Sequence, residues 1–170
     1  MTGPDIGKAR SSAKIETDFG GFSSSNTMLR IRQAYVNLDW GKSAVLVGIT
    51  WHPLFGAVMP DVLNLSTGAP FQPFNRSPQI RYQYKANSRV QLTASVLWQL
   101  QYLSSGPKGM SEDYIKNSCI PEMFVGADFT PADGWLMGLG AHMISLKPRT
   151  STEWKEQTFK VNEPMTAFSY

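Results

Sequence analysis

The 170-residue chain has little charge, one cysteine, two histidines and no long apolar run. Only 17% of its residues are charged, below the roughly one quarter usual in soluble globular domains, so a soluble helical protein is disfavoured. No stretch approaches about 18 uncharged apolar residues, which excludes an ordinary membrane-spanning helix. The longest apolar run, 44–49, has the length of a strand. Any membrane role therefore requires strands.

Cysteine and histidine, the residue types that most often form disulfides or bind zinc, are also scarce. The single cysteine, Cys119, allows no internal disulfide, and with only His52 and His142 beside it the sequence shows no zinc cluster. The net charge of +3 is mild and the basic residues are scattered singly, which gives no support to nucleic-acid binding. We expect no metal, no cofactor and no nucleic-acid partner.

The sequence does have a period-two alternation of apolar and polar residues. Ile80, Tyr82 and Tyr84 alternate with polar residues in one strand, and after a turn at 86–88 a second strand over 89–102 alternates in the same way. At about 3.4 Å per residue the second strand would be roughly 40 Å long. The paired strands present one apolar and one polar face, which suits both a membrane barrel and a soluble sandwich.

The alternation predicts an all-β chain of about eight strands in antiparallel up-and-down order. The expected strands are 13–19, 27–39, 44–51, 78–85, 89–102, 120–130, 135–147 and 164–170. The tight connections are 40–43, 86–88 and 131–134, and the longer ones are 20–26, 52–77, 103–119 and 148–163. Short turns at one rim and long loops at the other are typical of transmembrane β-barrels, whereas a Greek-key sandwich has no reason to show them. With no repeat or linker, 1–170 is expected to be a single barrel domain or partial barrel.

The polar face carries the candidate pore-lining residues. Pairing the first two strands across 20–26 sets Glu16 opposite Arg30, and in the same register Lys14 faces Arg32. Basic side chains in a lumen attract anions, although a structural ladder of ion pairs is an equal interpretation. The candidate pore-lining residues are Glu16, Arg30, Arg32, Arg81, Gln83, Lys85 and Gln91.

The second strand has a mixed pattern. Leu29 and Ile31 define an outer face, but Ala34 and Val36 fall on the opposite parity. Either a bulge near Gln33 resets the register or this part of the wall is less polar.

The 52–77 connection is too long for an ordinary link and is rich in proline, glycine and apolar residues. Such a segment packs against something. It either folds into the barrel lumen or forms an outer cap or subunit contact. In the lumen it would narrow the pore, and the candidate constriction residues are Asp61, Asn64 and Arg76.

Aromatic residues gather near the expected strand ends. This placement is typical of the girdles of membrane barrels at headgroup level, with the core of a soluble barrel as the competing account. The residues are Trp40, Trp51, Trp98, Tyr102 and Trp135.

Four segments together resemble a known family. They are Phe-Gly-Gly at 19–21, Leu-Arg-Ile-Arg-Gln-Ala-Tyr-Val at 29–36, Leu-Val-Gly-Ile-Thr-Trp at 46–51 and Asn-Arg-Ser-Pro-Gln-Ile-Arg-Tyr at 75–82. In this order they resemble Gram-negative outer-membrane porins of the dicarboxylate-specific type. The resemblance covers roughly 13–102.

The resemblance implies passive diffusion of small hydrophilic, and in part anionic, solutes across the cell outer membrane. It places Arg30, Arg32 and Arg81 in the wall and a long loop in the lumen. It also implies a barrel of about sixteen strands, often trimeric, of which this chain would be the front part with open first and last strands.

Catalysis has little support. Gly138-Leu139-Gly140 lacks a third glycine and a following helix, and His142 near Ser145 has no third orienting residue. We therefore expect no enzyme. Two alternatives to a porin stay open: a small closed eight-stranded barrel with a structural or adhesive role, and a soluble lipocalin-like barrel that binds a ligand. The direction in which Leu92, Val96 and Trp98 point distinguishes the lipocalin from the membrane barrels.

Overall fold

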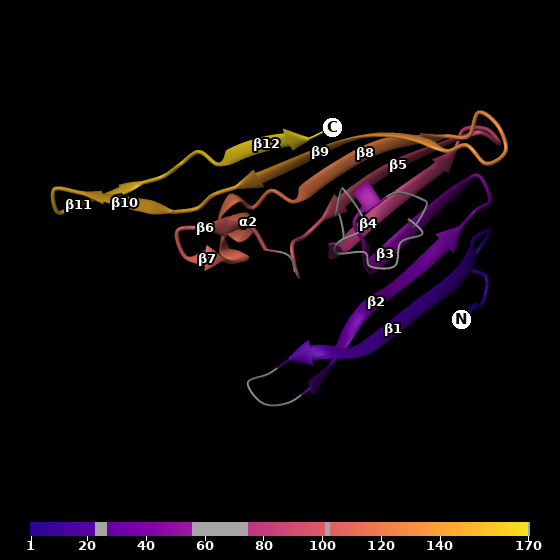
Figure 1. Cartoon of the computed structure of the whole chain (residues 1–170), viewed down its shortest axis with the longest axis horizontal. Helices are drawn as coiled ribbons and strands as arrows, with labels where there is room; N and C mark the ends of the chain where they lie inside the picture. Colours follow the sequence, from indigo (N-terminus) through magenta and orange to yellow (C-terminus); the bar gives the residue numbers. More distant parts are fainter. Residues whose placement is uncertain (23–26, 56–74, 101–102, 170) are drawn as a thin grey trace.

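The computed structural model describes residues 1–22, 27–55, 75–100 and 103–169. One antiparallel sheet of eight strands dominates them, and each strand lies beside its neighbour in the order β1-β2-β3-β4-β5-β8-β9-β12 (Figure 1). The strands are β1 (Arg10–Phe22), β2 (Thr27–Asp39), β3 (Ser43–Trp51), β4 (Arg76–Lys85), β5 (Val90–Leu97), β8 (Glu122–Phe129), β9 (Met137–Leu146) and β12 (Met165–Ser169). The predicted all-β, antiparallel, up-and-down arrangement of about eight strands is confirmed.

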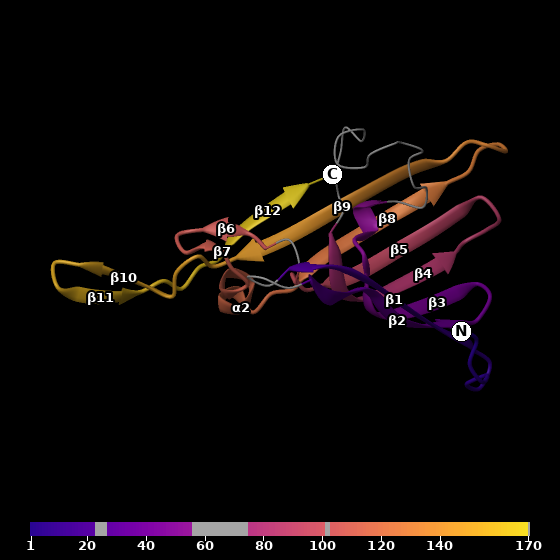
Figure 2. The same ribbon diagram turned by 60° about the horizontal axis from the view of Figure 1, so that its bottom comes forward.

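The sheet is not closed. Among the strands of the described residues, β1 pairs only with β2 and β12 pairs only with β9. Residues 1–3 cover the start of the outer edge of β1, where Thr2 forms a bridge with Ser12. No described strand pairs with the rest of that edge or with the outer edge of β12. Figures 1 and 2 show a twisted, open sheet with these two strands at opposite ends. No helix in the described ranges is long and apolar enough to cross a lipid bilayer.

The connections at one end of the sheet are short, and those at the other end carry extra structure. The β5–β8 connection holds the hairpin β6 (Ser105–Gly106) and β7 (Gly109–Met110), followed by α2 (Asp113–Ser118). The β9–β12 connection holds the hairpin β10 (Ser151–Trp154) and β11 (Gln157–Lys160), which extends beyond the sheet (Figures 1 and 2). The connections at 103–119 and 148–163 are longer ones, as expected, and they contain secondary structure of their own. The β1–β2 connection is also short, because β1 runs to Phe22.

The α2 connection has a small core of its own. Tyr114 and Ile115 are fully buried, and the Tyr114 hydroxyl donates to the carbonyl of Gly109 at 2.9 Å. Ser118 Oγ donates to the carbonyl of Ser145 in β9 at 2.8 Å. Apolar burial thus stabilises the connection itself, and the hydrogen bond from Ser118 ties it to the sheet.

The expected single strand over 89–102 is too long. β5 ends at Leu97, which interrupts the apolar alternation and is 2% exposed on the otherwise polar face. Beyond it, Gln99 Nε2 donates to Ser104 Oγ at 2.8 Å and to Glu122 Oε1 at 2.7 Å. These side-chain hydrogen bonds fix the segment after Leu97, where the backbone hydrogen bonds of β5 end.

A bulge in β2 explains its mixed pattern. Glu16 pairs with Gln33, but the next residue, Thr17, pairs with Ile31, so Arg32 is the extra residue. The bulge near Gln33, one of two expected alternatives, is therefore present, and it turns the later residues of β2 to the opposite parity.

The two faces of the sheet differ in chemistry and in exposure. The apolar face is the open one, with Val47 at 50%, Ile80 at 54% and Val96 at 40% exposure. On the polar face Gln79 and Ser95 are both 5% exposed. One row of paired residues on the apolar face crosses all eight strands: Ala13, Val36, Val47, Ile80, Val96, Met123, Met143 and Phe168.

Candidate functional site

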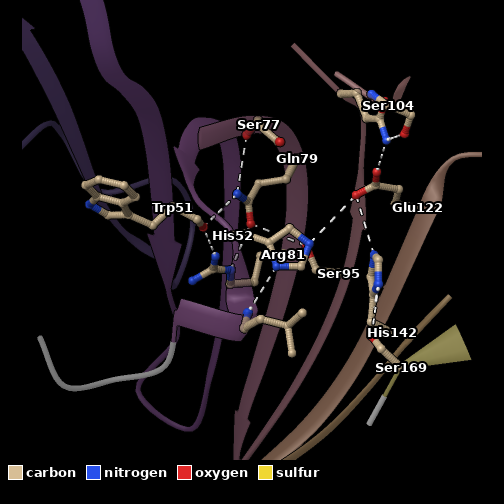
Figure 3. A network of polar contacts seen from close by, with 12 residues as sticks. Trp51, His52, Ser77, Gln79, Arg81, Ser95, Ser104, Glu122, His142 and Ser169 are labelled. Carbon is tan, nitrogen blue, oxygen red and sulfur yellow. Dashed lines mark hydrogen bonds and ion pairs between the residues drawn. The ribbon is translucent and has the colours of Figure 1, made fainter. Parts of the chain in front are cut away.

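The polar face of the sheet gathers the polar and charged side chains into two groups. One group, the β1–β2 charge cluster, consists of Lys14, Glu16, Asp18, Arg30 and Arg32. The other surrounds Glu122, between the end of β3 and strands β8 and β9 (Figure 3). Arg81 lies between the two groups along the sheet.

Two arginines of the charge cluster share one carboxylate. Arg30 binds Asp18 in a bidentate way, with Nε to Oδ1 at 2.9 Å and Nη2 to Oδ2 at 2.7 Å. Arg32 Nη1 donates to Asp18 Oδ2 at 3.1 Å. Paired hydrogen bonds of this kind fix the orientation of both planar groups.

Glu16 is the second carboxylate of the cluster. It accepts from Arg32 Nε at 2.7 Å and from Gln33 Nε2 at 2.7 Å, and Lys14 Nζ lies 2.9 Å away. Thr50 Oγ1 extends the network by donating to Gln33 Oε1 at 2.9 Å. Three cations therefore face two carboxylates, and the cluster keeps a net charge of +1.

The register predicted for these strands was wrong. Arg30 pairs with Asp18 rather than Glu16, and Lys14 pairs with Tyr35 rather than Arg32. The reason is the β2 bulge together with a second register shift between Asp18 and Gly21, neither of which a regular hairpin contains. Alternation correctly placed the charges on one face, but it does not determine which charges meet.

Arg81 is held by neutral acceptors. Its Nε donates to Gln79 Oε1 at 3.0 Å and its Nη2 donates to the carbonyl of Trp51 (Figure 3). Within the described part of the chain Arg81 forms no ion pair with a carboxylate. Its positive charge is therefore not neutralised by direct contact.

Arg81 lines a cavity of about 250 Å³ on the polar face, together with the predicted Gln83 and Gln91. Pro53 and Leu54 line the same cavity, so the turn η1 (Pro53–Phe55) lies over the polar face. The predicted Lys85 lies at the short-turn end, against two smaller hollows that also contain Gln91.

Of the predicted constriction residues, Arg76 lies in the described part of the chain. Arg76 is the first residue of β4, and its guanidinium lies 5.0 Å from the ring centre of Trp51, which corrects its placement in the 52–77 loop. Its cation–π stacking on a strand-end tryptophan explains this position. Asp61 and Asn64 lie outside the described residues.

The second group joins two histidines and one glutamate from three segments. His52 follows β3, Glu122 begins β8 and His142 lies in β9. Both Nε2 atoms face Glu122 Oε2, at 3.7 Å from His52 and 3.5 Å from His142 (Figure 3). The side chains of His52 and Glu122 are 6% and 4% exposed, and that of His142 is 14% exposed.

Sequence reasoning missed this His52–Glu122–His142 cluster and predicted no metal-binding group. The residues are far apart in the chain, and β4 and β5 lie between β3 and β8 in the sheet. One signal was present: alternation puts Glu122 and His142 on the polar faces of neighbouring strands. His52 joins them only because the chain turns over that face after β3.

No family model, no curated protein and no solved structure matches this chain. The exposed apolar face of the sheet, its polar face and the two clusters are thus the observations that bear on function.

Proposed function

We propose that this chain forms part of the wall of an outer-membrane porin through which small hydrophilic solutes diffuse passively. The observation that carries the proposal is the apolar row that crosses all eight strands on the exposed face of the sheet. Exposed apolar side chains in such number are unfavourable in water and favourable against lipid. Polar residues on the opposite face suit a water-filled lumen.

The ends of the sheet support the same function. Trp40 and Trp135, 45% and 68% exposed, lie in short turns at one end, where aromatic rings meet lipid headgroups. The turn at Pro53–Phe55 lies over the polar face, as the start of a loop that narrows a lumen would.

The open edges at β1 and β12 favour a larger barrel over a closed barrel of eight strands. An exposed edge leaves backbone N–H and C=O groups unpaired, which a lipid environment does not tolerate. Further strands, to about sixteen in all, would pair both edges and widen the lumen. A homotrimer of such barrels fits the resemblance to dicarboxylate-specific porins.

The charges on the polar face favour weak selectivity for anions. The charge cluster keeps a net +1, and Arg81 adds a cation held by neutral groups. Most of the basic charge at β1 and β2 is neutralised by carboxylates, so Arg81 is the residue expected to act on passing solutes.

A soluble lipocalin-like barrel requires the opposite arrangement. Its apolar face would enclose the ligand and its polar face would meet water. Leu92 and Val96, at 43% and 40% exposure, lie on the open face instead.

Adjacent cysteine substitutions in β5 test the lipid-facing assignment. Leu92→Cys and Thr93→Cys, each in a Cys119→Ser background, carry a fluorophore after reconstitution into vesicles. We expect lipid-borne nitroxide to quench the label at position 92 and aqueous iodide to quench the label at position 93. The reverse result, or no insertion into vesicles, overturns the proposal.

Pore formation is tested separately. The full-length protein that contains this chain should give stepwise conductance in planar bilayers, with a modest preference for anions. A protein that inserts but gives no conductance would be a structural barrel.

A further inference from the structure

We propose that His52, Glu122 and His142 bind a divalent transition-metal ion, with Zn²⁺ as the best-suited probe. Two imidazoles and one carboxylate are a known set of three zinc ligands. Zinc is usually four-coordinate in proteins, so one position would remain for water or for an anionic group of a solute. The three donor atoms lie within 4.8 Å of one another.

The spacing of the donor atoms suits a shared cation better than direct hydrogen bonds. The Glu122 Oε2 atom lies 3.7 Å from His52 Nε2 and 3.5 Å from His142 Nε2, beyond the usual N–H···O range of about 2.7–3.2 Å. Zinc bonds of about 2.0–2.2 Å in a tetrahedron separate the ligand atoms by about 3.4 Å. A small movement of one ring would bring all three atoms to that separation.

Burial of the cluster favours the binding of a cation over that of a neutral molecule. The buried Nε2 atom of His142 has no hydrogen-bond partner within the described residues, and the Glu122 carboxylate is 4% exposed. An unpartnered imidazole nitrogen beside a buried carboxylate gains more from a cation than from a neutral molecule.

Neighbouring groups already orient two of the three ligands. Gln99 Nε2 donates to Glu122 Oε1 at 2.7 Å, which leaves Oε2 for the ion. Ser169 Oγ lies 3.4 Å from His142 Nδ1 and can accept a hydrogen bond from Nδ1–H. In that tautomer Nε2 presents its lone pair to the ion.

His52 must change its tautomer to bind. The backbone N–H of Leu54 donates to His52 Nδ1 at 3.2 Å, so neutral His52 carries its proton on Nε2. On metal binding Nε2 releases that proton, Nδ1 takes one up, and the contact with Leu54 opens. Metal binding is therefore coupled to a movement of the Pro53–Phe55 turn.

The ion would fasten this turn to β8 and β9 across the polar face. His52 is the last residue before the turn, and Glu122 and His142 lie in strands separated from β3 by β4 and β5. The proposal does not depend on membrane insertion or conductance, so its failure and that of the porin proposal are distinguishable.

Calorimetric titration of the full chain in detergent with Zn²⁺ tests the site. The protein carries Cys119→Ser, because the exposed thiol of Cys119 binds zinc by itself, and it has no histidine tag. We expect one ion per chain and a more than ~100-fold weaker affinity in the His142→Ala variant, since even outer-shell changes cost about 10–100-fold. The matched control is Glu112→Gln, which removes an exposed carboxylate and should leave the affinity unchanged.

A second measurement needs no substitution at the site. The chain has two histidines, both in the cluster, so zinc should protect both from diethylpyrocarbonate, as counted by mass spectrometry. Bound Co²⁺ should show the intense visible absorption of a tetrahedral site. Absence of zinc binding, or binding that is equal in the wild-type chain and the His142→Ala variant, overturns the proposal and leaves the cluster as a structural contact.

Discussion

Arg32 donates a hydrogen bond to Glu16 on the polar face, although the later β2 residues of the same parity, such as Val36, lie on the apolar face. The Arg32 Nε atom lies 2.7 Å from Glu16 Oε1 because Arg32 is the extra residue of a bulge. The bulge puts a third cation beside two carboxylates that already hold Lys14 and Arg30. Most of the charge in this cluster is therefore neutralised within it, and in the proposed pore the basic residue outside the cluster should have the greater influence on solutes.

That residue is Arg81, and its removal should reduce the preference for anions. In water a unit charge about 7 Å from a passing ion contributes about 0.6 kcal/mol, a factor of about three. Because the charge attracts anions and repels cations by that amount, we expect Arg81→Gln to lower the anion-to-cation permeability ratio about eightfold, measured from reversal potentials across a salt gradient.

The control for this measurement is Arg149→Gln, which removes the same charge from an exposed position after β9. The effect at Arg81 should diminish at high salt, where screening shortens the range of the charge. An equal change in both variants would show that only net charge matters.

Phe124 lies over two glycines of the polar face, and a side chain at either would displace it. A Cβ at Gly140 would come within 2.7 Å of the Phe124 ring, which is 7% exposed. We expect Gly140→Ala to lower the free energy of unfolding by about 1–3 kcal/mol, measured by urea unfolding in detergent.

Gly138→Ala is the matched control in the same strand. Its Cβ would meet only the flexible carboxylate of Asp128, at 3.2 Å, so we expect a change within about 0.5 kcal/mol. Equal destabilisation by the two variants would contradict the role assigned to the ring.

Gly48 allows β2 and β3 to approach closely. Its φ is +136°, and an added Cβ would lie 2.2 Å from the carbonyl oxygen of Ala34. We expect Gly48→Ala to cost about 3 kcal/mol or more, because backbone atoms must move, and to reduce the yield of folded protein.

Gly41→Ala separates this crowding from backbone strain. Gly41 also has a positive φ, of +87°, but nothing lies within 4 Å of its Cβ position. Its substitution should cost only about 1 kcal/mol by the same urea assay. A similar loss in both variants would mean that strain alone explains Gly48.

Gln99 is expected to position Glu122 for the proposed metal ion. Its amide is the hydrogen-bond donor to Glu122 Oε1, so Gln99→Ala should weaken zinc binding about 10–100-fold in calorimetric titration. The variant should also lose about 1–3 kcal/mol of unfolding free energy with or without zinc, since a buried carboxylate loses a partner.

Gln91→Ala is the control for Gln99. It also removes a glutamine side chain from the polar side of the sheet. Gln91 lies in β5, where it pairs with Asp128 of β8, away from Glu122. Gln91→Ala should leave the zinc affinity unchanged. Unchanged zinc affinity in Gln99→Ala as well would contradict the positioning role of Gln99.

Much of the fold follows from local pattern. Alternation such as Ile80, Tyr82 and Tyr84 specifies a strand and its two faces, because successive side chains point to opposite sides. Its interruption at Leu97 marks the end of β5, although the pattern resumes after it. The elements in the β5–β8 and β9–β12 connections carry no such alternation and were not anticipated.

The candidate site was predictable only in part. Arg81, Gln83 and Gln91 share a cavity as expected of residues on one face. The partners of Arg30 and Arg32 were not predicted. The parity change in β2 indicated a bulge near Gln33, but it did not identify the extra residue or the second register shift, between Asp18 and Gly21.

The sequence by itself determined that this chain is an antiparallel sheet with one apolar and one polar face, because a period of two needs only neighbouring residues to specify it. Tertiary structure alone decided that the apolar face is the open one and that His52 meets Glu122 and His142. Those relationships join segments that other strands separate, so they depend on how the sheet twists and where the chain crosses it, which no local pattern encodes.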